Sequence, residues 1–208
     1  RPSAADTGCR FWDTTLGQLF IYNGSAWIAV TAAVATGAAN GTGVAAAEAS
    51  GAVRKTTITF TNHAIALADN AGVVAYGGSK VYDFPEGAIL ILGAVADLDI
   101  TKSSAGVNDD WDGDFGVGTV TASNNATLSS TAQNIIPTTA TPQASSGATT
   151  ANGQSTATEN AVINGTATAA DVYLNVLVDH ADHDVTSTPC NLIVNGTLTI
   201  HWVPLGDY

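Results

Sequence analysis

The strongest constraint on the fold is a run of nine residues, DVYLNVLVD (171–179), in which apolar and other side chains alternate. Successive side chains of a strand point to opposite faces, so the alternation predicts a strand with one apolar face. That face would carry Val172, Leu174, Val176 and Val178. RKTTITFT (54–61) also alternates, and AILILGAV (88–95) is an apolar run of strand length. No amphipathic segment longer than ten residues has helical spacing, so we expect an all-β protein.

An Asn-Gly pair near the C-terminus predicts a hairpin. In CNLIVNGTLTIHW (190–202), alternating runs flank Asn195-Gly196, and Asn-Gly favours the positive φ angles of two-residue hairpin turns. Residues 123–160 hold almost no large apolar side chain, so we expect exposed loops or long excursions from a sheet there. Short strands with long Gly-rich connections favour a jelly-roll-like β-sandwich, which we place at residues 54–208.

The segment RFWDTTLGQLFIYNGSAW (10–27) is unusually aromatic. It holds five of the chain's fourteen aromatic residues, namely Phe11, Trp12, Phe20, Tyr22 and Trp27. We expect residues 1–30 to form a small aromatic β module with strands at 9–13, 18–22 and 26–30 and turns at Leu16-Gly17 and Asn23-Gly24. Three strands are about the minimum for independent stability, and large aromatic side chains would supply the buried area. We therefore expect Trp12 and Trp27 to be buried, against each other or against a partner chain.

Residues 31–53 are rich in Ala and Gly and contain no large side chain. Such a segment buries too little apolar area to offset the entropy of ordering. We expect an Ala/Gly-rich linker, or an arm that orders only against a partner. A chain that begins near Arg54 should then fold without it.

The charge balance excludes some partners. Six basic residues face eighteen acidic ones, and all six lie before residue 103. Phosphate groups need nearby cations, so nucleic acid and anionic membrane surfaces are poor partners. No apolar run approaches the 18 residues of a transmembrane helix. The acidity suits a protein that stays soluble at high local concentration, or one with a cationic partner surface.

The segment NDDWDGDFG (108–116) is a candidate calcium site. Its carboxylates are Asp109, Asp110, Asp112 and Asp114. Alternating carboxylates in a Gly-containing loop can wrap Ca²⁺, but the EF-hand template fails, because Thr119 stands where its bidentate Glu belongs. The alternative is a solvated acidic loop.

The segment DHADHD (179–184) is a second, weaker metal candidate, with His180, Asp182 and His183 as ligands. The His-x-x-His spacing suits a metal only in a turn, since positions i and i+3 of a strand face opposite ways. The alternative is polar surface. His63 and His201 stand alone, and we expect them to be sheet residues.

The remaining chemistry is sparse. Cys9 and Cys190 are far apart and outside any C-x-x-C pattern, which leaves two free thiols or one long-range bridge. There is no nucleophile elbow and no phosphate loop, and nothing selects a pair of catalytic carboxylates. We therefore expect no enzyme and no cofactor, apart from the possible Ca²⁺.

Two sets of motifs resemble bacteriophage proteins. FWDTTLGQLFIYNGSAW (11–27) is similar to an aromatic tag that recurs in virion proteins of tailed bacteriophages, often in fibre or appendage proteins. Three segments at 71–94, 108–119 and 183–202 resemble phage proteins of unassigned role found among capsid and head-assembly products. The resemblance implies a structural virion protein, and it supplies no catalytic or binding residues.

These observations lead to three functional hypotheses. The first is a capsid decoration or cement protein on the outer head surface, assembled in the host cytoplasm. It would be a homotrimer attached to the major capsid protein or another virion protein through the aromatic module or the connector. The second is a head-fibre or tail-fibre domain that contacts the host. The third is a secreted carbohydrate-binding module with exposed aromatic platforms.

Overall fold

The computed structural model describes residues 8–13, 18–29, 36–70, 74–123, 127–159, 161–179 and 190–206. The chain divides into two compact units, the N-terminal unit (Arg1–Ala35) and the body (Thr36–Tyr208). In the described residues the regular structure is strand, apart from one short 3-10 helix, η1 (Ser130–Ala132). The prediction of an all-β protein is confirmed.

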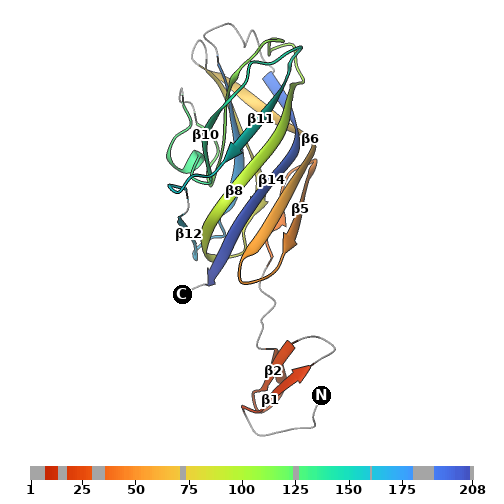
Figure 1. Ribbon diagram of the computed structural model, residues 1–208, viewed down its shortest axis with the longest axis vertical. Helices are drawn as coiled ribbons and strands as arrows, with labels where there is room; N and C mark the ends of the chain where they lie inside the picture. The colour runs from red at the N-terminus through yellow and green to blue at the C-terminus, as the bar shows by residue number, and fades with distance from the viewer. Residues whose placement is uncertain are drawn as a thin grey trace. The chain divides into compact units, whose positions relative to one another are not determined.

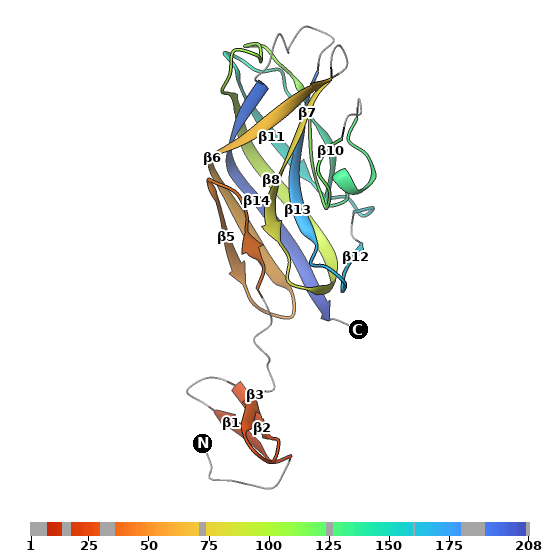
Figure 2. The ribbon, with the colours of Figure 1, turned by 180° about the vertical axis from the view of Figure 1, so that it is seen from behind.

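The N-terminal unit is a three-stranded antiparallel sheet in the order β1-β2-β3 (Figure 2). Its strands are β1 (Arg10–Asp13), β2 (Gln18–Tyr22) and β3 (Trp27–Ala29). All three predicted strands are present. Gly24 has a φ of 98°, and the side-chain oxygen of Asn23 accepts the N–H of Ala26 at 2.8 Å, as the Asn23-Gly24 turn requires. The other predicted turn, Leu16-Gly17, lies outside the described residues.

The body is built from one large antiparallel sheet. Its strands are β4 (Ala38–Ala39), β5 (Val44–Ala49), β6 (Arg54–Asn70), β7 (Val74–Asp83), β8 (Gly87–Lys102), β9 (Gly113–Gly118), β10 (Ile136–Thr141), β11 (Ala148–Gln154), β12 (Val162–Gly165), β13 (Asp171–Asp179) and β14 (Cys190–Gly206). The main strand order is β10-β9-β13-β7-β6-β14-β8-β11, with β12 beside β8, β4 beside β7 and β5 beside β6.

The strands of the body pair from the outside of the sequence inward. The first long strand, β6, pairs with the last, β14; β7 pairs with β13, β8 with β11, and β9 with β10. Figure 1 shows β6, β14, β8 and β11 side by side, and Figure 2 shows β7 and β13 on the other side of the body. The sheet thus folds over one core as a nearly closed barrel or sandwich.

Alternation explains which side chains fill this core. Every second residue along most of β8 is buried, and the predicted apolar face of β13 is fully buried. The core also holds the two largest buried side chains, Trp111 and Trp202, together with Phe84, whose ring meets Trp202 edge-on with 5.1 Å between centroids. Residues 54–61, 88–95 and 171–179 all lie in strands, so these three predictions are confirmed.

The predicted connector is wrong for residues 36–53, which belong to the body. Strand β5 pairs with β6 along its length, and Glu48 anchors it in the interior. The Glu48 carboxylate accepts hydrogen bonds from Arg54 and from the Tyr82 hydroxyl, the latter at 2.6 Å. Burial raises the pKa of Tyr82, and the Glu48 carboxylate raises it further. The composition of residues 31–53 does not reveal this buried ion pair, because Glu48 is one charged residue among many small ones and changes the average composition of the segment very little.

The predicted C-terminal hairpin is also wrong. Strand β14 runs through Asn195-Gly196, where a register shift between Val194 and Gly196 marks a bulge against β6. The Asn195 side-chain oxygen accepts the N–H of Asn62 at 2.8 Å, and Gly196 has a φ of 116°. Of the pair, Gly196 adopts the positive φ, but it serves a bulge and not a turn, because β14 is held by neighbours on both sides.

Within residues 123–160, which we expected to be exposed loops or long excursions from a sheet, two segments are strands, β10 and β11. At one position of β11 a glycine is needed because a large core side chain occupies the adjacent space. A Cβ atom on Gly153 would lie 2.5 Å from the Phe115 ring. Among the described residues, no helix has the length and hydropathy needed to cross a membrane.

Candidate functional site

The acidic segment begins in a turn anchored by tryptophan. The Trp111 side chain is fully buried, and its indole N–H donates to the carbonyl oxygen of Gly147 at 3.1 Å. Asp109, in the same turn, forms an ion pair with Lys102, with 2.5 Å between Nζ and Oδ1. Asp110 is exposed. These two carboxylates therefore do not join the others.

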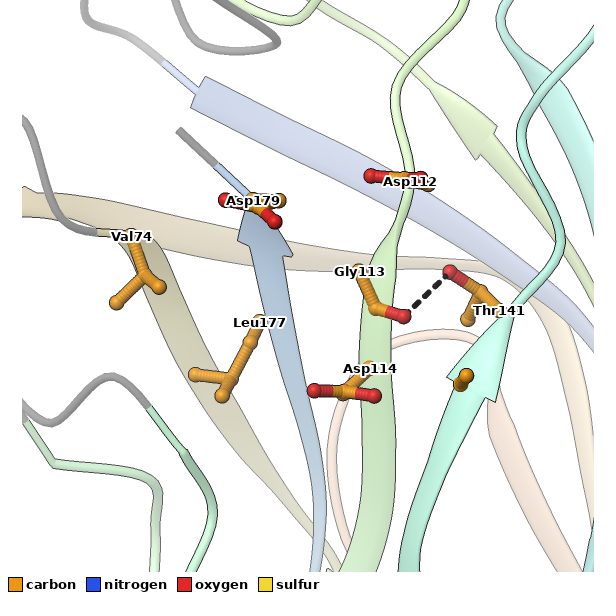
Figure 3. A pocket seen from close by; sticks show the side chains of 8 residues that line it. Val74, Asp112, Gly113, Asp114, Thr141, Leu177 and Asp179 are labelled. Carbon is orange, nitrogen blue, oxygen red and sulfur yellow. Dashed lines mark hydrogen bonds between the residues drawn. The ribbon is translucent and has the colours of Figure 1, made fainter. Parts of the chain in front are cut away.

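Asp112 and Asp114 lie beside a surface pocket of about 400 Å³ at the start of β9. Figure 3 shows that Asp179, at the end of β13, completes the acidic part of the lining. Val74 and Leu177 supply apolar walls. The backbone N–H of Asp179 donates to the carbonyl oxygen of Asp112 at 3.0 Å, so the two strand ends are tied together.

A close approach of β9 and β13 shapes this pocket. A Cβ atom on Gly113 would lie 2.0 Å from the carbonyl oxygen of Leu177, so only glycine allows the strands to meet here. The Gly113 carbonyl oxygen accepts the Thr141 hydroxyl at 3.1 Å. The residues that line the pocket include neither lysine nor arginine.

The electrostatics of the pocket follow from its three carboxylates. Burial raises the pKa of Asp114, and the negative charges of Asp179 and Asp112 raise it further. A cation entering the pocket would relieve this repulsion. However, no group of three or more His, Cys, Asp or Glu side chains in the described part of the chain is arranged to hold a metal.

The structure therefore divides the predicted metal ligands. Two of the four aspartates in 108–116 line the pocket, whereas His180, Asp182 and His183 lie outside the described residues. Asp179 is the lining residue that the calcium prediction missed. Its position at the end of an alternating strand was visible in the sequence, but its partner strand was not.

The N-terminal unit supplies the second candidate site. Phe11, Phe20 and Trp27 pack as one cluster, with ring centroids 6.4 Å apart for Phe11 and Phe20 and 5.8 Å apart for Phe11 and Trp27. Tyr22 extends the cluster to Trp27 at 5.4 Å. Trp12 is not part of it and is 57% exposed. Within a single chain the prediction that Trp12 is buried is therefore wrong, whereas Trp27 is half-buried.

The remaining predicted residues have structural positions. Cys9 and Cys190 are not joined in a disulfide; Cys9 is half-buried and Cys190 is buried. His63 is buried in β6, with its Nδ1 atom 2.8 Å from the carbonyl oxygen of Thr42, and His201 is exposed in β14. Both histidines are sheet residues, as expected.

Comparison with known proteins gives no assignment, since no family model, no curated protein and no solved structure matches this chain.

Proposed function

We propose that this chain is a structural protein of a tailed-bacteriophage virion, most simply a decoration or cement protein on the outer surface of the head. The observation that carries the proposal is the division of charge between the two units. In residues 1–35 two arginines balance two aspartates, whereas residues 36–208 hold four basic and sixteen acidic residues, a net charge of −12. A neutral aromatic unit is suited to attachment, and an acidic body is suited to a crowded, solvent-facing surface.

The strand pairing supports the proposal. Pairing from the outside inward (β6 with β14, β7 with β13, β8 with β11, β9 with β10) is the pattern of a long hairpin wrapped into two layers. We read this as a jelly roll, an architecture used by viral capsid and lectin domains. Fold alone does not give function, so this argument is secondary to the charge division.

The proposed assembly is a homotrimer formed by the body, with the N-terminal unit of each chain bound to the major capsid protein or another virion protein. Three such units would act together, so contacts that are individually weak would still hold the complex through effective concentration. The proposal includes neither catalysis nor a bound cofactor, nucleic acid or membrane.

One observation favours a second candidate. An exposed tryptophan such as Trp12 is also a suitable platform for a sugar ring, which would fit a carbohydrate-binding module or a host-contacting fibre domain. A fibre would be present at a few copies at a vertex or tail, and a sugar-binding module would bind glycan in the absence of any particle.

Copy number tests the proposal directly. In purified particles of the virus that encodes this chain, its abundance should be comparable with that of the major capsid protein. Adding back the full chain and a chain that begins at Thr36 to particles assembled without it tests attachment. Only the full chain should bind, and absence of the protein from purified particles would refute the proposal.

A further inference from the structure

The sheet of the N-terminal unit has two faces, and its aromatic residues are divided between them. One face carries the cluster of Phe11, Phe20, Tyr22 and Trp27, whose rings cover one another. Phe20 is only 4% exposed. These four residues thus form the core of the unit itself, and their rings pack against one another instead of facing a partner.

Among the side chains that the structure describes, the other face carries Arg10, Trp12 and Ile21, which we name the docking face. Arg10 and Trp12 alternate with Phe11 along β1, so they point away from the aromatic cluster. Ile21 is the partner of Arg10 across the β1–β2 ladder, so both lie on this face. Trp12 is 57% exposed and Arg10 is exposed. An exposed indole beside an exposed arginine on so small a sheet is suited to contact with another protein.

We infer that the docking face is the surface that binds the virion partner, and that the partner offers an apolar groove bordered by carboxylates. This inference rests on the proposed function. Tryptophan and arginine are the residues most often responsible for the free energy of binding at protein interfaces. Charge complementarity sets the border of the groove, because an arginine guanidinium binds carboxylates with two parallel hydrogen bonds.

Self-association through the docking face agrees less well with the charge of Arg10 than binding to an acidic partner does. A symmetric contact pairs the same patch on both copies. On a sheet of three short strands this would bring Arg10 near the Arg10 of the other copy, and like charges at an interface are unfavourable. A partner with acidic groups removes this repulsion, whereas a second copy creates it.

Binding of the full chain to purified particles assembled without it tests the inference. Trp12→Ala and Arg10→Glu should each weaken binding by about tenfold or more. The conservative variants Trp12→Phe and Arg10→Lys should weaken it less. Val162→Ala, which shortens a 59%-exposed side chain in the body, is the matched control and should bind like the unchanged protein. Because Arg10 is exposed, Arg10→Glu tests the face even where Trp12→Ala does not fold.

The outcomes separate the inference from the proposed function. If removal of residues 1–35 abolishes binding while Trp12→Ala and Arg10→Glu bind normally, the docking face is wrong and the proposed function stands. If Trp12→Ala alone loses binding, the carboxylate border is wrong, since a neutral platform such as a sugar would explain the result. If the chain that begins at Thr36 binds as well as the full chain, attachment through the N-terminal unit is wrong, and this inference fails with it.

Discussion

Asn175 is a buried polar residue that ties the loops after β9 to strand β13. Its side-chain oxygen accepts the N–H of Ala122 at 2.7 Å, and its amide nitrogen donates to the carbonyl oxygens of Val120 and Ala132 at 2.9 and 2.7 Å. Asn175→Ala would leave these backbone groups, of which those of Ala122 and Ala132 are buried, without their partner, so we expect the free energy of unfolding to fall by about 3 kcal/mol. Urea denaturation measures the change. Asn152→Ala, at an exposed position of β11, should stay within about 0.5 kcal/mol of the unchanged protein.

We expect Asp114 to make the stability of the body depend on pH. Its pKa is raised in the folded state by burial and by the charges of Asp179 and Asp112, so the folded chain holds this proton more tightly than the unfolded chain does. Stability should therefore decrease as the pH rises from about 4 through the raised pKa. Asp114→Asn removes this cost, and we expect its Tm at pH 7 to be higher by no more than about 3 °C, because partly solvated charges interact weakly.

The test compares melting curves of the protein and Asp114→Asn from pH 4 to pH 7. Added salt should narrow the difference at pH 7, because it screens the repulsion among the carboxylates. A lower Tm for Asp114→Asn at pH 7 would show that the Asp114 charge stabilises the pocket and would contradict the argument.

At the scale of single residues, the sequence identified the segments that hold the two candidate sites but not the contacts made within them. It pointed to the acidic segment and the aromatic segment as candidates. It did not indicate that Asp109 forms an ion pair with Lys102, because the geometry of the turn after β8 decides that contact. It also did not indicate that Asp179 joins Asp112 and Asp114, because that contact depends on the long-range pairing of β13 with β9.

Strand β5 is held to the body by the ion pair between Glu48 and Arg54. Arg54 is 2% exposed and lies over the Trp202 ring, 5.2 Å from its centroid. Glu48→Gln would leave this buried arginine without its counter-charge, so we expect a loss of about 3 to 5 kcal/mol in the free energy of unfolding. Glu86→Gln, at an exposed position, is the matched control. Equal stability of the two variants in thermal denaturation would contradict this role of Glu48.

The same argument sets the shortest chain that folds. A chain that begins at Thr36 retains β4, β5 and Glu48, so it should melt cooperatively with the Tm of the body in the full chain. A chain that begins at Arg54 lacks β5 and exposes the edge of β6, which invites aggregation. We expect it to be insoluble or strongly destabilised, as gel filtration and circular dichroism would show. A stable, monodisperse product would restore the boundary expected from composition.

At the scale of elements, the sequence predicted strands wherever apolar residues alternate, as in 171–179, because burial of one face imposes that pattern. It failed where small residues form strands. Residues 44–49 and 148–154 lie in strands because β6 and β8 offer them backbone partners, and such pairing leaves little trace in composition. The hairpin predicted at Asn195-Gly196 was wrong for the opposite reason. Gly196 does adopt a positive φ, but pairing with β6 and β8 places it in a bulge and not in a turn.

At the scale of the whole molecule, the charge division predicts opposite salt dependences for the two proposed contacts. The body carries the entire net charge of −12, so trimer formation brings three strongly acidic units together, and added salt should strengthen it by screening their repulsion. Binding to the particle through Arg10 and a carboxylate border is an attraction of opposite charges, and added salt should weaken it.

Light scattering of the chain that begins at Thr36, from about 20 to 500 mM salt, should show a trimer that persists to lower protein concentration as salt increases. Particle binding by the full chain should lose affinity over the same range. A body that stays monomeric at all salt concentrations would exclude the trimer, and particle binding that strengthens with salt would indicate a purely apolar contact in which Arg10 has no part.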